Sequence, residues 1–357
     1  MKKFVLFATI VLLASCSNNK SYSYIGDAPT EEISISSIDS LQSSLLGNVN
    51  FIKLQEPDET FAEIEGIQVY NDTIYLFDKM ERNILMSFNK QGKHLVTFGE
   101  RGNSKNEYTR LWAFDIDDKY VYAYDRGKKR MMYFTHDGKF VKVQETKFRG
   151  DSFKTLSNGK FLFSLALEKS LNKLVLTDNS LNIEKVLLSF NEKDKDNLAH
   201  NNILQKTDDK IVYNKEMSDS IYIFSDNGKC INTYYMNFEG AKVPQEYKCD
   251  FEKLYDEGKS KDYAYIDDCP FLGDTTLLVP LAYKGRYGVL YYDLETKKVK
   301  KPKEITIGVP NLLYATKNNL YGWMDSDTYG YINNTSVPKD VSSFIEKGGR
   351  VIVCAKL

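Results

Sequence analysis

The side chains that could do chemistry in this sequence are scattered carboxylates, three histidines and five cysteines. No G-x-S-x-G nucleophile elbow occurs, and His94, His136 and His200 do not stand beside a serine or cysteine in a recognisable motif. Asp78 and Asp125 both end a Tyr-rich run, 47 residues apart, and such a pair could bind a metal or serve as an acid–base couple. Alternatively, each short acid accepts backbone N–H groups of the turn that follows. The repetition favours this second, structural role.

The N-terminus has the three parts of an export signal. Two lysines precede an apolar run at 4–13, and two small residues precede Cys16. The run is shorter than the roughly 20 apolar residues that a membrane-spanning helix needs. The order Leu13-Ala14-Ser15-Cys16 resembles the lipobox of bacterial lipoproteins, which implies cleavage before Cys16 and a lipid on its thiol. An ordinary secretory signal with a chance cysteine is the alternative.

These features divide the chain into a signal peptide (1–15), a flexible tether (16–30) and a mature domain (31–357). We expect the N-terminal lipid to be the only membrane attachment. Ser17 stands where lipoproteins retained in the inner membrane commonly carry Asp, so we expect the outer membrane, with the leaflet undecided.

Four cysteines follow Cys16, namely Cys230, Cys249, Cys269 and Cys354. Disulfides can form in an oxidising envelope, and Cys249 and Cys269 enclose a segment with the pattern of an insertion. Four cysteines allow three pairings, so a Cys249–Cys269 bridge is one of three possibilities. No C-x-x-C spacing occurs, so a cysteine–histidine metal site is not indicated.

The elements that must position these residues are short strands in a repeated unit. One unit runs through 73–78, 83–88 and the turn 89–93, and the next through 120–125, 130–134 and the turn 136–139. The glycines of the two turns, Gly92 and Gly138, are 46 residues apart. A period of about 40–50 residues with about four strands is typical of β-propeller blades.

The repeat predicts an all-β, six-bladed propeller of four-stranded antiparallel blades. The fifth unit arrives late because 239–262 has helical spacing after Pro244, which predicts a short helical insertion. The last unit is one strand short, and bare strand edges invite aggregation. We therefore predict that an N-terminal strand closes the ring, and of the two candidates, 32–36 and 49–54, we favour the first.

In a propeller the innermost strands surround a central channel, where functional groups usually lie. The polar residues of these strands that we expect to face the axis are Glu65, Asp115, Lys154, Gln205 and Asp268. Trp112 and Tyr265 are added as aromatic binding residues, because such rings combine apolar area with a polar tip. Packing between blades is the alternative role for both rings.

A family resemblance rests on the segment 98–108, which reads Phe-Gly-Glu-Arg-Gly-Asn-Ser-Lys-Asn-Glu-Tyr. It resembles the Gly-rich linker of NHL- and TolB-like propellers, except that 104–106 replace the usual Gly-Pro-Gly. Together with the lipobox, residues 30–357 are similar to the six-bladed propeller lipoproteins of Bacteroidetes. This resemblance is specific for the fold and says little about function. Lactonase-like relatives hold a divalent cation in the channel with Glu, Asn and Asp ligands, which implies calcium or a similar ion as an alternative here.

The charge balance of the mature chain limits the classes of partner that it could bind. The mature chain carries 46 basic and 49 acidic side chains, and such a balanced surface argues against nucleic acid. With no catalytic motif in the sequence, we predict a non-enzymatic envelope lipoprotein that binds a protein, peptide or glycan partner and needs no cofactor. The alternative is a metal-dependent, lactonase-like hydrolase with its site in the channel.

Overall fold

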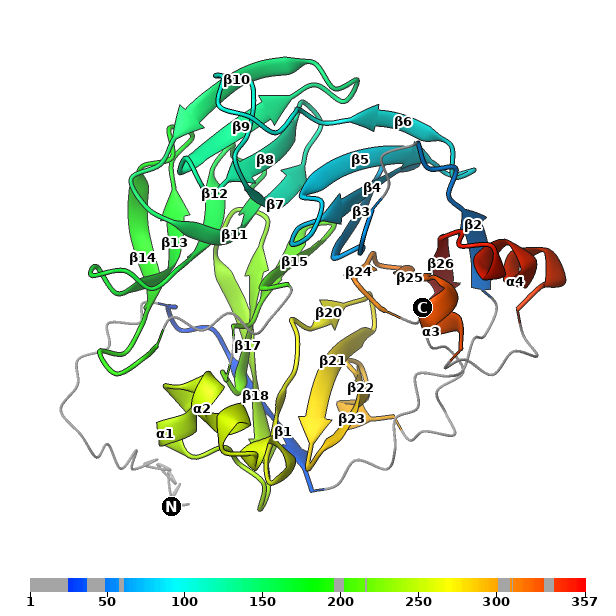
Figure 1. The fold of residues 1–357 in the computed structure, drawn as a ribbon. Coiled ribbons are helices and arrows are strands. Elements are labelled where there is room, and N and C mark those ends of the chain that lie inside the picture. Colours follow the sequence, from blue (N-terminus) through cyan, green and yellow to red (C-terminus); the bar gives the residue numbers. More distant parts are fainter. Residues whose placement is uncertain are drawn as a thin grey trace, which may run out of the picture.

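The computed structural model describes residues 25–36, 49–57, 61–195, 202–215, 217–300, 309, 311–330 and 337–357. Within these residues, six small sheets surround one axis like the blades of a fan (Figure 1). Each blade runs from an inner strand outward, and its strands are joined mostly by tight turns. The predicted six-bladed β-propeller is confirmed.

The blades follow one another along the chain. Blade one contains β3 (Gly66–Tyr70), β4 (Thr73–Asp78), β5 (Ile84–Asn89) and β6 (His94–Thr97), and blade two contains β7 (Leu111–Ile116), β8 (Val121–Asp125), β9 (Arg130–Phe134) and β10 (Phe140–Glu145). Blade three contains β11 (Gly150–Thr155), β12 (Phe161–Leu165), β13 (Asn172–Thr177) and β14 (Ile183–Ser189), and blade four contains β15 (Leu204–Thr207), β16 (Lys210–Tyr213), β17 (Ser220–Ser225) and β18 (Cys230–Phe238). Blade five contains β19 (Ala264–Ile266), β20 (Phe271–Leu272), β21 (Thr276–Tyr283), β22 (Arg286–Asp293) and β23 (Lys298–Val299), and blade six contains β24 (Tyr314–Ala315), β25 (Asn319–Met324) and β26 (Val351–Lys356).

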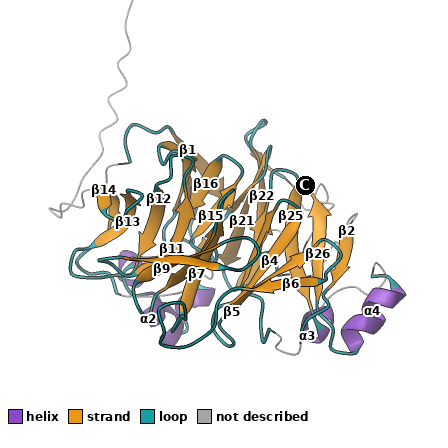
Figure 2. Cartoon of the chain, turned by 90° about the horizontal axis from the view of Figure 1, so that it is seen from above, coloured by secondary structure: helices purple, strands orange, loops and turns teal. Residues whose placement is uncertain are grey.

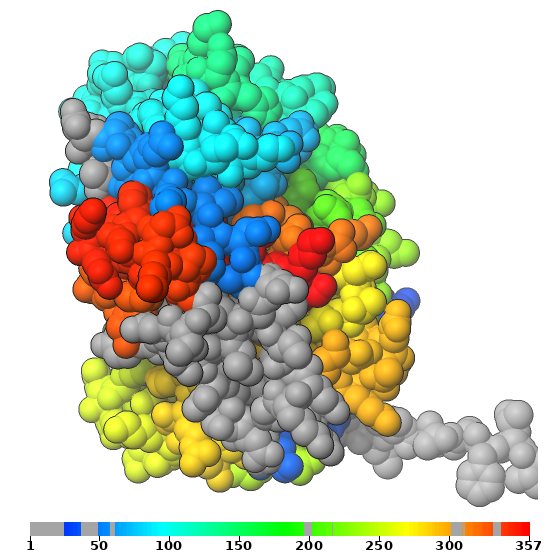
Figure 3. Space-filling view, turned by 90° about the vertical axis from the view of Figure 1, so that its right-hand side faces the viewer, coloured from blue at the N-terminus to red at the C-terminus, as the bar shows by residue number. Residues whose placement is uncertain are grey.

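The ring is closed by β2 (Val49–Lys53), which pairs antiparallel with β26 and becomes the outer strand of blade six. Figure 3 shows these N-terminal residues, in blue, beside the C-terminal residues in red. An N-terminal closing strand is therefore confirmed, but our preference for the first candidate was wrong. That candidate is β1 (Thr30–Ile35), which pairs in parallel with β18 as a fifth strand of blade four. Along the chain, the last strand of each blade is followed by the inner strand of the next blade, and of the two N-terminal strands only β2 precedes β3 in this way.

A glycine turn supports this closure. Gly92 has φ +80°, and a Cβ atom there would lie 2.0 Å from the backbone oxygen of Lys53 at the end of β2. Its own carbonyl accepts a hydrogen bond from the N–H of Gln55 at 2.7 Å. A side chain at this position would be strained and would push β2 away from blade one.

We expect Gly92→Ala to lower the free energy of unfolding by roughly 2 kcal/mol, measured by urea denaturation. Gly159 is the matched control, because its φ is +74° but a Cβ atom would meet nothing within 4 Å. An equal loss in the two variants would show that backbone strain alone, and not the contact with β2, accounts for the effect.

The helices interrupt two connections of the ring. Between β18 and β19 lie α1 (Gln245–Lys248), α2 (Phe251–Asp256) and a 3-10 turn, η1 (Lys259–Lys261), with Pro244 at the start of α1. Between β25 and β26 lie α3 (Ser326–Tyr329) and α4 (Lys339–Glu346). Figure 2 shows the helices along one face of the ring. In the described part of the chain, none has the length and apolarity to cross a bilayer.

The core consists of layers between neighbouring blades. Tyr75, Phe98 and Phe134, for example, are buried between blades one and two, with ring centroids about 6 Å apart. These layers fix the blades against one another, so the inner strands form a rigid wall around the axis.

Candidate functional site

The helix-bearing face contains the mouth of the central channel. In every blade the inner strand is antiparallel to the second, so its start lies beside the end of that second strand. Side chains from blades one to four meet there around a recess of about 50 Å³. The residues that line it and carry polar side chains are Glu65, Gln68, Lys79, Trp112, Asp151, Ser152, Lys154, Asn202 and Gln205. Four of the seven predicted site residues, Glu65, Trp112, Lys154 and Gln205, are among them.

Glu65 lies directly before β3 and is largely buried. Its Oε2 accepts hydrogen bonds from the backbone N–H groups of Lys79 (2.6 Å) and Met80 (2.7 Å), which hold the turn after β4. Burial raises the pKa of the Glu65 carboxyl, although these two hydrogen bonds act in the opposite direction. The carboxylate therefore shapes the rim of the mouth as well as lining it.

Trp112 in β7 is the aromatic centre of the mouth. Three cations surround its ring: the Lys79 ammonium is 4.6 Å, the Arg126 guanidinium 4.2 Å and the Arg110 guanidinium 5.2 Å from its centroid. Such contacts favour a positive charge over the ring face. Because cations already cover the ring, it offers little face for stacking a sugar.

Asp115 and Lys154 form an ion pair below the mouth. Lys154 Nζ lies 3.0 Å from Asp115 Oδ1, while Oδ2 accepts from the backbone N–H and the hydroxyl of Thr155, both at 2.7 Å. Burial opposes ionisation of Asp115, but the ammonium groups of Lys154 and Lys206 and the Thr155 bonds hold its pKa below the ordinary value. This pair joins the inner strands of blades two and three.

Gln205, in the inner strand of blade four, contacts blade six. Its side-chain amide donates to the backbone oxygen of Leu313 at 3.2 Å, and Thr207 Oγ1 donates to that of Ala315 at 3.3 Å. Both bonds run from the inner strand of blade four to blade six. The inner strand of blade four is therefore tied directly to blade six.

Besides Asp115, two further predicted residues lie outside this recess. Asp268 follows the inner strand of blade five, and its Oδ1 accepts from the backbone N–H groups of Cys269 (2.7 Å) and Asn202 (3.1 Å), so it supports a residue of the recess without lining it. Tyr265 was expected near the channel, but it is 2% exposed and packs beneath the helical insertion, with its hydroxyl 2.7 Å from that of Tyr255. The packing role is thus the correct one for Tyr265.

Sequence reasoning missed the acid that organises the mouth, Asp151 in β11. Its Oδ2 lies 2.9 Å from Lys215 Nζ and its Oδ1 lies 3.2 Å from Arg126, and all three side chains are mostly buried. A usable signal was present. Lys79 and Arg126 directly follow the Asp that ends the second strand of their blade, and Lys215 follows Asn214, the first residue after β16, so the three cations occupy similar positions.

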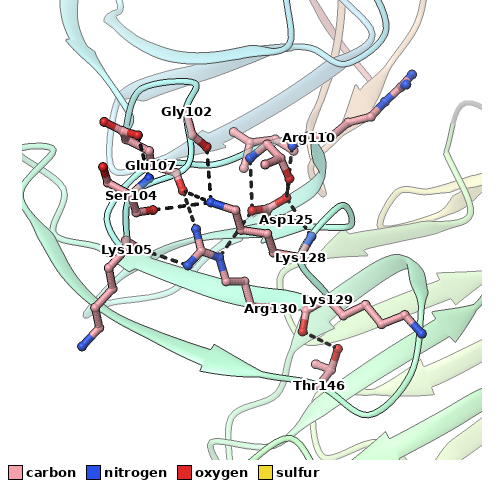
Figure 4. A network of polar contacts seen from close by, with 12 residues as sticks. Gly102, Ser104, Lys105, Glu107, Arg110, Asp125, Lys128, Lys129, Arg130 and Thr146 are labelled. Carbon is pink, nitrogen blue, oxygen red and sulfur yellow. Dashed lines mark hydrogen bonds and ion pairs between the residues drawn. The ribbon is translucent and has the colours of Figure 1, made fainter.

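The strand-end acids themselves are structural, as their repetition indicated. Asp78 Oδ1 accepts from the backbone N–H groups of Glu81 (3.1 Å) and Arg82 (2.8 Å) in the following turn, and Oδ2 accepts from that of Ala62 (2.7 Å). Asp125 does the same for the next blade (Figure 4), accepting from the N–H groups of Thr109 (3.2 Å) and Arg110 (3.1 Å). Each acid therefore ties the incoming linker to the turn after the second strand.

The Gly-rich linker is also held by cations. Lys128 Nζ donates to the backbone oxygens of Gly102 (3.2 Å) and Glu107 (3.4 Å), and Arg130 donates to those of Lys105 (3.1 Å) and Glu107 (Figure 4). These bonds fix the segment that departs from the usual Gly-Pro-Gly. The linker is firmly held here without those residues.

The four cysteines that follow Cys16 are free thiols in the structure. The suggested Cys249–Cys269 disulfide is therefore wrong. Cys269 is fully buried, with its Sγ 3.3 Å from the backbone oxygen of Ile203, whereas Cys249 Sγ accepts from the Gln245 side chain at 3.4 Å. The two thiols lie in separate environments. Cys16 and His200 fall outside the described residues.

The channel carboxylates do not fit a divalent cation. Among the described residues, no three His, Cys, Asp or Glu side chains are close enough to share a metal ion. Asp115 is already bound by an ammonium and a hydroxyl donor, and Lys79 and Lys154 add positive charge to the same recess. A metal bound by oxygen ligands requires the opposite balance of charge.

A larger groove of about 510 Å³ lies between blades two and three, by the turns at the other end of the inner strands. Tyr122 and Tyr133 form its buried wall, with Lys142 Nζ 4.3 Å above the Tyr133 ring. No predicted site residue lines it.

A family model described as a domain of unknown function, DUF4934, matches residues 29–348. The chain belongs to the DUF4934 family. That match contains β1 to β25, and β26 of blade six lies beyond its end. No curated protein matches the sequence.

Two crystal structures of Bacteroides proteins resemble this DUF4934 propeller. One is described as a "Putative exported protein" from Bacteroides fragilis; it is 19% identical, covers 92% of this chain and 99% of its own, and has a TM-score of 0.72. The other is a DUF4221 family member from Bacteroides vulgatus; it is 9% identical, covers 89% and 98%, and has a TM-score of 0.56. At these identities the likeness establishes the shared fold.

Proposed function

We propose that this DUF4934 protein is an exported, lipid-anchored envelope protein that binds a partner, without catalysis, at the mouth of its channel. The observation that carries the proposal is the mouth itself. Four blades contribute charged and aromatic side chains to it, yet its acids, Glu65 and Asp151, and the Asp115 below them already bind backbone N–H groups or cations. Such an arrangement suits recognition better than proton transfer, which needs an acid or base near the reacting group.

Export is supported by the signal-like N-terminus and by the likeness to a structure named as a "Putative exported protein". Two or three acyl chains at Cys16 give stable membrane attachment. Residue 25 is only nine positions from Cys16, a stretch that spans at most roughly 30 Å. Ile25 to Pro29 lie against the turn before β18, and Figure 2 shows β1 away from the helices. The lipid would therefore hold the opposite face toward the membrane and leave the mouth accessible, with the outer membrane as the site we favour.

The anchor is tested with Cys16→Ala. We expect this variant to lose all incorporation of an alkyne-labelled fatty acid and to move from the membrane fraction to the soluble fraction. Cys354→Ala is the control, because it removes a thiol in the last strand and should leave both readouts unchanged. Labelling that persists in Cys16→Ala would rule out this lipidation site.

Binding is tested in the native envelope by chemical crosslinking and quantitative mass spectrometry. Lys79→Met removes a cation of the mouth, and Lys142→Met removes a lysine that lies over a tyrosine in the larger groove. A partner that crosslinks to wild type and to Lys142→Met, but at least tenfold less to Lys79→Met, supports the mouth as the binding site. A partner profile unaffected by Lys79→Met contradicts it.

A further inference from the structure

The cations of the mouth come from three blades at one equivalent position. Lys79, Arg126 and Lys215 follow the second strands of blades one, two and four. Lys79 and Arg126 both lie against the Trp112 ring, and Arg126 and Lys215 share Asp151. Like charges brought together repel one another, so the cluster requires a compensating negative charge.

Protein acids compensate only part of this charge. Asp151 binds two of the cations, but in the described part of the chain the Lys79 ammonium makes no hydrogen bond and no ion pair, and its contact is the Trp112 ring. Glu65 directs its Oε2 to backbone N–H groups. Burial lowers the pKa of Lys79, although the nearby carboxylates of Glu65, Asp151 and Asp268 act in the opposite direction.

A second donor faces the same recess. The side-chain nitrogen of Asn202 is buried, lines the recess and has no hydrogen-bond acceptor among the described residues. Buried polar atoms without a partner are rare in native proteins, and each one calls for an explanation. One charged and one neutral donor in one recess match the two oxygens of a carboxylate.

The size of the recess limits what can enter. Its volume of about 50 Å³ is far below the roughly 300–1,000 Å³ of pockets that enclose whole small ligands. A group the size of a carboxylate fits, while the rest of the ligand must remain outside, on the helix-bearing face.

We propose that the mouth captures a terminal carboxylate of its ligand between Lys79 and Asn202. The inference rests on the proposed binding function and adds the chemistry that is recognised. Ligand oxygens would accept from the Lys79 ammonium and the Asn202 amide, with Arg126, which also contacts the Trp112 ring, supplying additional positive charge.

The test titrates the full mature protein with acetyl-trialanine as the free acid and as the amide, and follows binding by calorimetry and by Trp112 fluorescence. Trp323 is buried in blade six and contributes a constant background. We expect saturable binding of the acid, and binding at least tenfold weaker for the amide. Glucuronic acid and glucose form a parallel pair that distinguishes a sugar carboxylate from a peptide one.

Lys79→Met should weaken binding of the acid about 10- to 100-fold, the range for losing a hydrogen bond to a charged group. Lys142→Met should bind like wild type, and Lys79→Gln replaces Lys79→Met if the latter does not fold. Equal binding of acid and amide, no binding of either acid, or unchanged binding by Lys79→Met would overturn the carboxylate proposal. If an envelope partner still depends on Lys79 in the crosslinking experiment, the binding function survives that failure.

Discussion

Replacing Lys154 by methionine should lower the free energy of unfolding by about 3–5 kcal/mol, because it leaves the Asp115 carboxylate buried without its cation. Asp115 is 1% exposed, and Lys154 Nζ, at 3.0 Å, is its ion-pair partner. The two Thr155 hydrogen bonds would remain, but they cannot neutralise the charge. Urea denaturation followed by circular dichroism measures the loss.

The control for this variant is Lys160→Met in the same blade. Lys160 Nζ pairs with Glu184 at 2.5 Å, but both side chains are about 40% exposed. Exposed pairs contribute about 0–1 kcal/mol, so this substitution should change stability little. Similar losses in Lys160→Met and Lys154→Met would mean that burial does not govern the Asp115–Lys154 pair.

The pH dependence of stability gives an independent check. The pKa of Asp115 is lower in the folded state than its ordinary value of 3.8, so its ionised form stabilises the fold. That contribution is complete above the ordinary value and is lost as the pH falls through the lowered pKa. In Lys154→Met the Asp115 carboxylate lacks the Lys154 ammonium, so its pKa should be higher than in the wild type, and protonation should remove part of the cost of burying its charge. The stability difference between wild type and variant should therefore shrink below about pH 4.

The sequence predicts the inner strands well, because the blade period is visible in several features at once. The predicted channel residues Asp115, Lys154, Gln205 and Tyr265 lie in the inner strands β7, β11, β15 and β19, and Glu65 directly precedes β3. The sequence of β1 does not indicate which blade it joins, because its alternation of apolar and polar residues would fit the outer edge of any blade. Only the adjacency of β2 to β3 distinguishes the two N-terminal strands.

Side-chain direction explains the errors at the site. Tyr265 is in a predicted inner strand, but alternate residues of a strand point to opposite sides, and its side points to the core beneath α2. Lys79 and Arg126 were overlooked because they follow a strand instead of lying in it. Asp78 and Asp125 hold the turns that follow the second strands. The residue after each acid, Lys79 or Arg126, is therefore expected at the mouth.

The second large effect is expected at Asp125, whose hydrogen bonds connect the linker to the turn after β8. Asp125→Ala should lower the free energy of unfolding by about 3–5 kcal/mol. Asp125 is 0% exposed and accepts bonds from the backbone N–H groups of Thr109, Arg110 and Lys128, while Arg130 Nε lies 3.4 Å away. The substitution leaves these partly buried donors without their acceptor and the buried Arg130 guanidinium without its carboxylate.

The location of the damage makes the prediction specific. Arg130 and Lys128 also hold carbonyls of the linker, so we expect faster amide hydrogen exchange at Thr109 and Arg110 and in the adjoining linker (Figure 4). Asp178→Ala is the control, because Asp178 accepts from Ser180 and Asn182 in a solvent-exposed hairpin turn, where water can replace it. Its effect should be much smaller and confined to that turn. If exchange at Thr109 stays slow in Asp125→Ala, the linker is held by the cations alone and the acid is not the tie between blades.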